Sequence, residues 1–359
     1  MSKEYPSHLA TRQADVVIIG AGLAGLSAAR LLTASSIDVV VLDARERVGG
    51  RTFTHPASDG TRIDHGAQWI GPTQDRLAAL AEALGVTTFP TYNSGSHIEY
   101  KQGKRATYTG AIPTSDPLVT MEAVETLLNV SILAQEVPLD APWTAPSAGE
   151  WDAQTVASWI ERNIESEGAR NLLTLGVQAV FSVEPRDLSF LHFLFYIHSG
   201  GNLNMLLSVA RGAQERRFSG GAQSIANLVA AELGERVVLN APVHTITQDE
   251  RGVRVESDSL SVTARRAIIA LPPTLAGRLR YRPALPGYRD QLTQRVPMGT
   301  VIKVHCLYDT PFWRDEGLSG QVVSDSGIIR ITFDNSPESG TPGVLLAFIE
   351  GDEGRMWGR

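Results

Sequence analysis

The apolar positions of this chain change their spacing several times, and each change predicts a different kind of element. Residues 16–19 and 39–42 are short, continuous β-branched runs, which are typical of buried strands. The amphipathic stretch between them predicts a helix, so the chain opens with a strand–helix–strand unit. The strand pattern returns at residues 236–239, 243–248, 253–257 and 266–270, and again at 301–308, 319–324, 327–334 and 344–350.

Helical spacing dominates the middle of the chain. After a helix expected at 74–84, residues 88–112 predict a loop with a short hairpin, and the Pro- and Ala-rich residues 138–149 predict a surface connection. From 152 to 217 the pattern is mainly helical, with Thr155 as an expected N-cap. The segments 172–181 and 188–197 are apolar nearly all round, as in helices that are buried or line a pocket.

This order of elements predicts an α/β fold made of two domains. A Rossmann-like domain, residues 14–88 and 219–292, is interrupted by an α+β substrate domain, residues 89–218 and 293–359, with a mainly antiparallel sheet. A chain of 359 residues is long enough for two such cores. Ligands of two-domain proteins commonly bind in the cleft between the domains, and we expect that here.

Composition narrows the function classes. The net charge of −7 and the absence of a basic run disfavour a nucleic-acid or anionic membrane surface. The single cysteine, Cys306, excludes an internal disulfide framework, suits a cytoplasmic location and is expected to be a buried apolar residue. The polar N-terminal segment lacks a secretory signal, no apolar run reaches the ~18–20 residues of a membrane span, and the histidine spacing predicts no metal site.

A glycine-rich turn connects the first strand to the first helix in G-x-G-x-x-G spacing. Gly20 permits the tight turn, Gly22 leaves room for a pyrophosphate, and Gly25 lets the helix pack closely on the strand. The helix N-terminus that follows, with Leu23 and Ala24 in its first turn, offers N–H groups and a positive dipole end to phosphates. Asp43 ends the second strand near the ~20-residue offset at which a carboxylate meets an adenosine ribose, and it disfavours the 2′-phosphate of NADP.

A second glycine pair follows Asp43 and separates flavin from nicotinamide as the ligand. Backbone amides at such a pair approach a bound group closely, and Arg51 is suited to a bidentate phosphate contact. A solvated loop charge is the alternative for both arginines, more so for Arg47 than for Arg51. The D-A-R-x-R-x-G-G-R-T segment resembles that of the flavin-dependent amine oxidase family, where it contacts FAD. The resemblance implies a non-covalent FAD bound in part by Ala44, Arg45, Gly49, Gly50 and Arg51.

Further segments resemble the same family. The D-H-G-A-Q-W-I-G-P run at 64–72 is similar to the loop against the flavin ring, which implies flavin contacts for Gly66, Ala67, Gln68 and Trp69. Val243 matches the strand whose backbone contacts the adenine. Lys303, in R-V-P-M-G-T-V-I-K, matches the lysine that binds a water facing flavin N5 and assists O2 reduction; burying it in an apolar strand is costly without such a role.

The resemblance also implies which residues line the substrate cavity. Gln214, in G-A-Q-E-R, matches a glutamine that faces the substrate cavity, and the expected lining is apolar, which suits a hydrophobic amine. The expected lining residues are Ala179, Val180, Leu206, Leu207, Gln214, Val323, Ile331, Phe333 and Phe348. The implied reaction is oxidation of a primary or secondary amine to an imine and then an aldehyde, with O2 reduced to H2O2.

Several alternatives stay open at this stage. An L-amino acid oxidase would need an arginine facing the substrate carboxylate, for which Arg330 is the candidate. A flavoprotein-like binding module without catalytic activity is a second alternative, and a nicotinamide dehydrogenase is a third. The family continues with a segment that returns to the FAD domain, so we expect a C-terminally truncated chain. The amine and the oligomeric state, a homodimer included, are left open.

Overall fold

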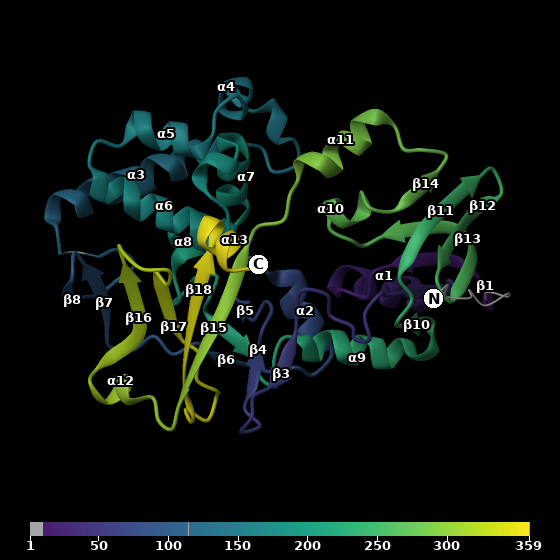
Figure 1. The fold of residues 1–359 in the computed structure, drawn as a ribbon, viewed down its shortest axis with the longest axis horizontal. Coiled ribbons are helices and arrows are strands. Elements are labelled where there is room, and N and C mark those ends of the chain that lie inside the picture. Colours follow the sequence, from purple (N-terminus) through teal and green to yellow (C-terminus); the bar gives the residue numbers. More distant parts are fainter. Residues whose placement is uncertain (1–9, 114, 359) are drawn as a thin grey trace. The chain divides into compact units, whose positions relative to one another are not determined.

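The computed structural model describes residues 10–113 and 115–358, which form two compact units (Figure 1). Among the described residues, the first unit contains 10–68, 79–87 and 220–298, and the second contains 69–78, 88–113, 115–219 and 299–358. These bounds differ from the sequence expectation, because residues 69–78, 88 and 219 lie in the second unit and 293–298 in the first. The α/β fold class, with an interrupted first unit, is confirmed.

A seven-stranded sheet forms the centre of the first unit, in the order β10-β2-β1-β13-β12-β11-β14. The long strand β1 (Ala10–Ile19) pairs in parallel with β2 (Val39–Leu42) and β13 (Leu260–Ile269). The remaining strands are β10 (Val237–Val238), β11 (Val243–Asp249), β12 (Gly252–Ser257) and β14 (Arg280–Arg282). All four residues of β2 are buried, which explains why its sequence is continuously apolar rather than alternating.

Helices α1 (Leu23–Ala34) and α9 (Gln223–Leu233) pack on one another and on this sheet. Their shared core includes Ile18, Leu26 and Val229, each at most 1 % exposed. The unit also contains the hairpin of β3 (Thr54–Pro56) and β4 (Arg62–Asp64), and the helices α10 (Pro273–Ala276) and α11 (Gly287–Arg295). Helix α2 (Asp75–Ala83) begins in the second unit and ends in the first.

The second unit is built on a six-stranded sheet in the order β15-β18-β17-β16-β7-β8. Its strands are β15 (Val301–Tyr308), β18 (Gly343–Glu350), β17 (Ile331–Asp334), β16 (Leu318–Ser324), β7 (Ser96–Lys101) and β8 (Lys104–Tyr108). Every neighbouring pair is antiparallel except β16 and β7, so the expected mainly antiparallel sheet is confirmed. The strand expected at 327–334 is shorter, because residues 327–328 form a bend and 329–330 have no regular structure. A small sheet contains β5 (Trp69–Ile70), β9 (Arg216–Phe218) and β6 (Thr88–Pro90).

Helices make up the rest of the second unit, and they surround a core that contains Phe190, Phe193 and Ile197, which are fully buried. Thr155 caps α5 through a capping box with Ser158, as expected. The helices around this core are α3 (Pro117–Gln135), α4 (Ala148–Asp152), α5 (Val156–Asn163), α6 (Glu167–Phe181), α7 (Phe190–Ser199) and α8 (Leu203–Leu207), with 3-10 turns at Pro142–Thr144 and Pro185–Asp187. The unit also contains the short helix α12 (Phe312–Asp315).

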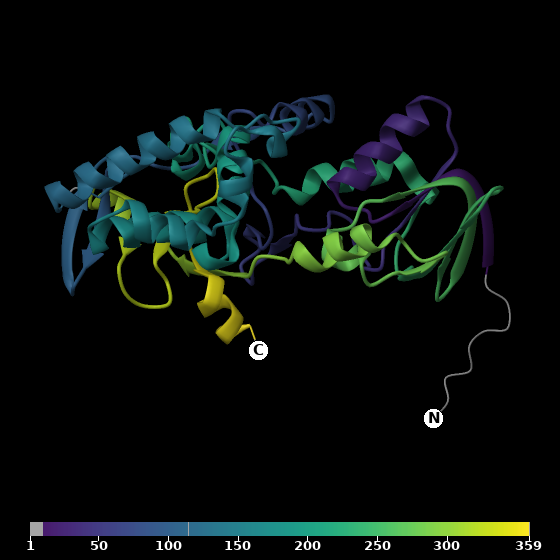
Figure 2. The ribbon, with the colours of Figure 1, turned by 90° about the horizontal axis from the view of Figure 1, so that it is seen from above.

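Helix α3 corrects one sequence expectation. It is 19 residues long with a mean hydropathy of 1.3, so by length and composition alone it is apolar enough to cross a membrane. The sequence pattern concealed this because Glu122 and Glu125 interrupt the apolar run. One face, which includes Val130 and Ala134, is buried in the helical core, whereas Leu128 and Ile132 are more than half exposed. Figure 2 shows this helix, in blue, along the outer side of the unit's helices.

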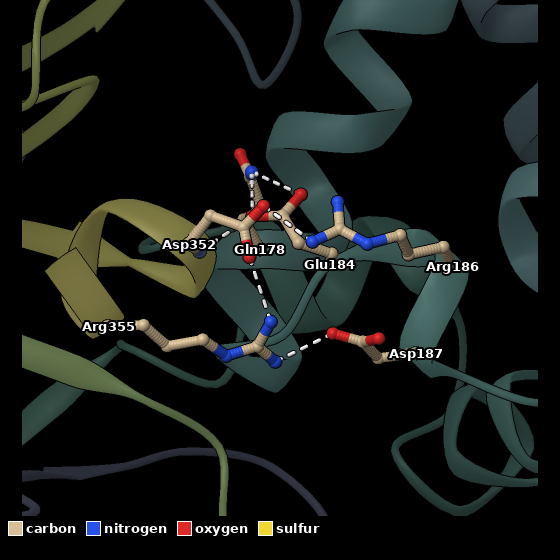
Figure 3. A network of polar contacts seen from close by, with 6 residues as sticks. All are labelled: Gln178, Glu184, Arg186, Asp187, Asp352 and Arg355. Carbon is tan, nitrogen blue, oxygen red and sulfur yellow. Dashed lines mark hydrogen bonds and ion pairs between the residues drawn. The ribbon is translucent and has the colours of Figure 1, made fainter.

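The short helix α13 (Gly351–Trp357) is held to the second unit by a polar network (Figure 3). Arg355 bonds to Asp187 at 2.6 Å, and the carboxylate of Glu184 accepts hydrogen bonds from Gln178 and from the backbone N–H of Asp352. Cys306 does not fit its expected buried position. It is exposed because β15 forms the edge of the six-stranded sheet.

Candidate active site

The three glycines of the first turn lie in different surroundings, and a side chain would meet a different obstacle, or none, at each position. Gly20 has φ +108°, and a Cβ there would lie 2.8 Å from the carbonyl oxygen of Ala270. A Cβ on Gly25 would lie 2.0 Å from the carbonyl oxygen of Gly20, so helix and strand approach too closely for any side chain. A Cβ on Gly22, in contrast, would meet no protein atom closer than 4.0 Å. Gly22 therefore leaves open space that the protein's own packing does not require.

The N-terminus of α1 borders this open space. Gly22 is the N-cap and provides no side-chain hydrogen bond, so the first-turn N–H groups of Leu23, Ala24 and Gly25 have no intrahelical acceptors. No acidic side chain occupies the first turn either. Together with the positive end of the helix dipole, this arrangement is suited to binding an anion such as a phosphate.

Asp43 is buried at the end of β2, and its carboxylate is oriented by the backbone. Oδ2 accepts a hydrogen bond from the N–H of Ala21 at 2.8 Å, and Oδ1 accepts one from the N–H of Arg45 at 2.9 Å. Because an ionised carboxylate has about four acceptor positions, both oxygens remain able to accept a ligand hydroxyl. The carbonyl of Asp43 accepts from the N–H of Ala241, which places the segment before Val243 beside it.

The second glycine pair lies directly against the first glycine turn. The N–H of Gly49 donates to the carbonyl of Ala21 at 2.9 Å, and a Cβ on Gly50 would lie 3.3 Å from the Cα of Gly22. Two segments that are separate in the sequence thus converge with Asp43 on one place in the first unit. The geometry fits a dinucleotide: N–H groups for phosphate, free space beside glycine, and a carboxylate for ribose hydroxyls.

Arg47 holds the loop that presents this glycine pair. Its guanidinium donates to the carbonyls of Val48, Gly50 and Thr52, and it lies 4.3 Å from the ring centre of Phe53. Burial lowers the pKa of Arg47, with the neighbouring charge of Arg45 adding to the effect. Of the two interpretations that the sequence left open for Arg47, the solvated charge does not hold, because the side chain folds back onto its own loop.

Gln223, a residue that the sequence analysis missed, braces the same loop from α9. Its Nε2 donates to the carbonyl of Val48 at 2.9 Å, and its Oε1 accepts from the N–H of Thr54 at 2.9 Å. The side chain is only 6 % exposed. A glutamine at the start of a helix has no distinctive sequence signal, so only the folded chain identifies this role.

The expected flavin-ring loop begins next to the second glycine pair. The N–H of Ala67 donates to the carbonyl of Arg51 at 3.0 Å, and a Cβ on Gly66 would lie 2.1 Å from that same oxygen. Gln68 is almost completely buried, whereas the side chains of Ala44, Arg45 and Arg51 are exposed. The structure therefore brings the backbones of 49–51 and 66–67 together.

In the second unit, Lys303 lies among aromatic rings. Lys303 is opposite Phe348 in the β15–β18 ladder, and its Nζ is 5.9 Å from the ring centres of both Phe348 and Trp69. Trp69 also packs edge-on against Phe333 at 5.4 Å. Such distances allow a cation–π attraction, which holds the ammonium in this partly buried position.

An apolar cavity of about 80 Å³ lies in the second unit, and none of its described lining residues is charged. Four of the expected pocket residues line it: Ala179, Leu207, Val323 and Ile331. The rest of its lining is formed by Ala111, Ile112, Pro113, Ala123, Thr126, Leu127, Ala169, Leu172, Leu173, Leu175, Gly176 and Gln321. The sequence analysis missed the contribution of α3, since it did not identify that helix.

The other expected pocket residues lie outside this cavity. Val180 and Leu206 are each one position from a lining residue on a helix, which turns their side chains by about 100°. Phe333 and Phe348 pack in a cluster with Ile331 and Trp69. Gln214 donates to the carbonyl of Leu206 at 3.0 Å, and its buried Oε1 has no hydrogen-bond donor among the described residues.

The second unit contains two further ionisable side chains of interest, Glu350 and Arg330. Burial raises the pKa of Glu350 to about 8; it lies opposite Val301 at the end of β18, and the sequence analysis missed it. The guanidinium of Arg330 donates to the carbonyl of Ser324 and to Oε1 of Gln178, both at 3.3 Å. Both of these acceptors are neutral oxygens.

Comparison with known proteins identifies relatives over almost the whole chain. A family model described as flavin containing amine oxidoreductase matches residues 23–358. A Mycobacterium tuberculosis protein bearing the name flavin-containing monoamine oxidase AofH is 39 % identical over 336 residues, which cover 94 % of this chain and 74 % of that protein. Amine oxidase [flavin-containing] A of Bos taurus is 36 % identical over 339 residues, covering 93 % of this chain and 64 % of its own length.

Solved structures agree with these sequence relatives. Putrescine oxidase, in a wild-type structure bound to putrescine, superposes with a TM-score of 0.92 at 34 % identity, covering 96 % of this chain and 77 % of that one. Cyclohexylamine oxidase from Brevibacterium oxydans superposes with a TM-score of 0.91 at 33 % identity, with the same coverage of both chains.

Proposed function

This chain belongs to the flavin-containing amine oxidoreductase family, and we propose that it oxidises a primary or secondary amine to an imine with FAD as its flavin. The imine is hydrolysed by water to an aldehyde, and O2 is reduced to H2O2. The observation that carries the proposal is the convergence of Gly22, Gly50 and Asp43, which together fit an adenine dinucleotide.

Each group of residues in the first unit has a part in holding FAD. The uncapped N–H groups of α1 bind the pyrophosphate, and Asp43 accepts hydrogen bonds from the ribose hydroxyls. The backbone near Val243 contacts the adenine. The backbones of 49–51 and 66–67, which bond to one another, contact the remainder of the cofactor. When bound, the flavin accepts two electrons from the amine and passes them to O2.

The second unit provides the protein groups that bind the substrate and assist the reaction. An apolar cavity without charged lining disfavours an ammonium ion, so it binds the neutral amine, which is the form able to lose a hydride equivalent. Lys303 holds a water molecule that assists the reduction of O2. The rings of Trp69 and Phe348 keep the lysine side chain in place.

We further propose that FAD is bound without a covalent bond and that the protein is cytoplasmic. The sequence given contains one cysteine, Cys306, which is exposed on the edge strand of the second unit. A free, exposed thiol suits a reducing compartment. Denaturation of the purified protein should release all of its flavin into the supernatant, and retention of flavin on the precipitated chain would contradict the non-covalent proposal.

The activity is tested by peroxide release. The purified chain, with its flavin content measured by absorbance, is mixed with a panel of alkyl and arylalkyl amines in air, and peroxide is recorded with a peroxidase dye. Peroxide formation that requires amine supports the proposal. A flavin-loaded protein that releases no peroxide with any amine in the panel would refute it.

Arg330 supports one alternative, an L-amino acid oxidase. Its two acceptors are neutral, so the guanidinium has donors for a substrate carboxylate without breaking a strong ion pair. The panel therefore includes amino acids beside the amines that lack their carboxylate. Turnover of amino acids together with silence on the matched amines would favour the alternative.

A further inference from the structure

One row of residues crosses five strands of the six-stranded sheet of the second unit, from the edge strand β15 to β7, which lies next to the other edge strand. Following the pairing registers, Lys303 lies opposite Phe348, Phe348 opposite Ile331, Ile331 opposite Val323, and Val323 opposite Glu99. Residues paired in this way point to the same face of a sheet. The row therefore joins the lysine of the proposed active site, through apolar side chains, to a carboxylate.

The middle of this row is part of the apolar cavity, and its far end is part of a second cavity. Ile331 and Val323 line the apolar cavity, whereas Glu99 lines a neighbouring cavity of about 350 Å³. Pro113 and Leu172 line both, so the two cavities adjoin. The second cavity is strongly acidic: its described lining contains four carboxylates, Glu99, Asp116, Glu167 and Asp325, and one ammonium, Lys101.

The other carboxylates of this acidic cavity have local structural roles. Asp116 caps α3 by accepting from the N–H of Val119, and it lies 3.8 Å from the ammonium of Lys101. Asp325 accepts from the N–H of Gln102 at 3.0 Å. Glu167 lies in the first turn of α6, where a negative charge favours the helix dipole, and its side chain is exposed.

Glu99 has no such role. It is 8 % exposed, and its buried Oε2 accepts no hydrogen bond from any of the described residues. Burial, together with the nearby charge of Glu99, raises the pKa of Tyr108, so the phenol remains protonated beside the carboxylate. Glu99 lines a cavity, and a buried carboxylate oxygen without a donor is expensive to maintain unless a ligand supplies the donor.

We propose that Glu99 binds a second ammonium group of the substrate, so that the preferred substrates are long aliphatic diamines. This inference rests on the proposed function, since it requires the reacting amine to lie near Lys303. The apolar cavity then holds the methylene chain, and the acidic cavity holds the distal cation. Neighbouring strands are ~4.8 Å apart, so four steps separate the Cα atoms of Lys303 and Glu99 by roughly 19 Å. Short diamines therefore do not reach Glu99.

The first test compares diamines with monoamines of equal chain length in the flavin-loaded full chain. Diaminobutane, diaminooctane, diaminodecane and diaminododecane are set against butylamine, octylamine, decylamine and dodecylamine, and KM and kcat are measured for each. We expect the KM of the long diamines to be about 10-fold or more below that of the matched monoamines, with no such advantage for diaminobutane. Equal KM values at every length would overturn the inference while leaving amine oxidation intact.

The second test replaces Glu99 by its neutral isostere. Glu99→Gln should raise the KM of diaminodecane about 10-fold and leave both its kcat and the KM of decylamine unchanged. Glu165→Gln, an exposed carboxylate that does not line either cavity, is the matched control and should change neither value. An unchanged KM for diaminodecane in Glu99→Gln would show that Glu99 does not bind the distal cation.

Binding without turnover separates this inference from the proposed function. Calorimetry of diaminodecane with the anaerobic protein, its flavin reduced beforehand with dithionite so that no amine can be oxidised, should show binding that weakens in Glu99→Gln and is absent for diaminobutane. If no amine is oxidised but this pattern appears, the acidic subsite stands and the proposed reaction fails. If amines are oxidised and the pattern does not appear, the reaction stands and the subsite is wrong.

Discussion

Lys303 lies directly opposite Phe348 across the β15–β18 ladder, with its ammonium 5.9 Å from the phenyl ring centre. The ring of Trp69 lies at the same distance from the ammonium. Two rings of negative face potential hold the cation in a partly buried strand, where an unsupported lysine would be costly. The ammonium of Lys303 therefore has a fixed position within the second unit.

Replacing Lys303 by methionine should slow the reoxidation of the reduced flavin by O2 without weakening flavin binding. Methionine preserves the apolar length of the side chain and removes the ammonium that holds water. The enzyme reduced by amine is mixed with O2 in a stopped-flow instrument, and reoxidation should be about 100-fold slower or more. Lys104→Met, at an exposed position of β8, is the control. Unchanged reoxidation in Lys303→Met would remove Lys303 from the mechanism.

The two glycines of the first helix should respond differently to alanine. Gly22→Ala places a methyl group in open space, so the flavin-free protein should lose less than about 1 kcal/mol of stability, while flavin binding is lost. Gly25→Ala places a methyl group 2.0 Å from the oxygen of Gly20 and should cost about 3 kcal/mol or more. Urea unfolding of the flavin-free proteins and flavin absorbance measure both effects. Normal flavin content in Gly22→Ala would place the phosphate elsewhere.

Asp43→Asn should weaken flavin binding strongly. The amide retains one acceptor oxygen, so it can no longer accept from both Ala21 and Arg45 and also from a ribose. The dissociation constant of FAD from the flavin-free protein should rise about 10- to 100-fold, as expected for hydrogen bonds to a charged group. Glu46→Gln, an exposed carboxylate in the same loop, should have no effect. Equal affinities in the two variants would exclude Asp43 as the ribose ligand.

Glu350 should make the stability of the protein pH-dependent. Burial raises its pKa from the ordinary 4.5 to about 8, so the folded protein keeps a proton that the unfolded chain has already released in this range. The contribution of Glu350 to stability is therefore complete below about pH 4.5 and decreases as the pH rises to about 8. The decrease is on the order of 2–5 kcal/mol.

The variant Glu350→Gln is neutral at every pH and should not show this decrease. Denaturant unfolding at a series of pH values from acid to mildly alkaline should give curves that diverge, with the wild type losing stability relative to Glu350→Gln as the pH rises. Glu316→Gln, at an exposed position, should follow the wild type. Parallel curves for wild type and Glu350→Gln would show that Glu350 is not buried in its charged form.

Much of the region that we propose to bind the dinucleotide was predicted from the sequence, because the constraints on its backbone are local. A β-branched run, three spaced glycines, a helix and an acid at the end of the next strand act within one continuous segment, and each has a backbone reason that holds in any fold of this type. The same is true of Thr155, whose capping role depends on residues three positions away. The strand around Lys303 was also predicted, and its alternation places Lys303 on the same face as Val301 and His305.

The lining of the apolar cavity in the second unit was predicted less completely from the sequence. Ala179, Leu207, Val323 and Ile331 were identified, but the helix α3, which contributes Ala123, Thr126 and Leu127, was not. Two glutamates concealed its apolar character, and no motif marks it. Val180 and Leu206 do not line this cavity, because the rotation of a helix about its own axis is set by its packing.

What the sequence by itself determined is therefore the set of elements whose chemistry lies within one segment: the glycine turn, the acid that follows it, and the lysine strand. Only the tertiary structure decided that Arg47 and Gln223 hold the glycine loop, that Cys306 lies on an exposed edge, and that Lys303 and Glu99 share one row of the sheet. The physical reason is that backbone conformation depends on near neighbours, whereas strand order and register are set by the burial of surfaces far apart in the chain.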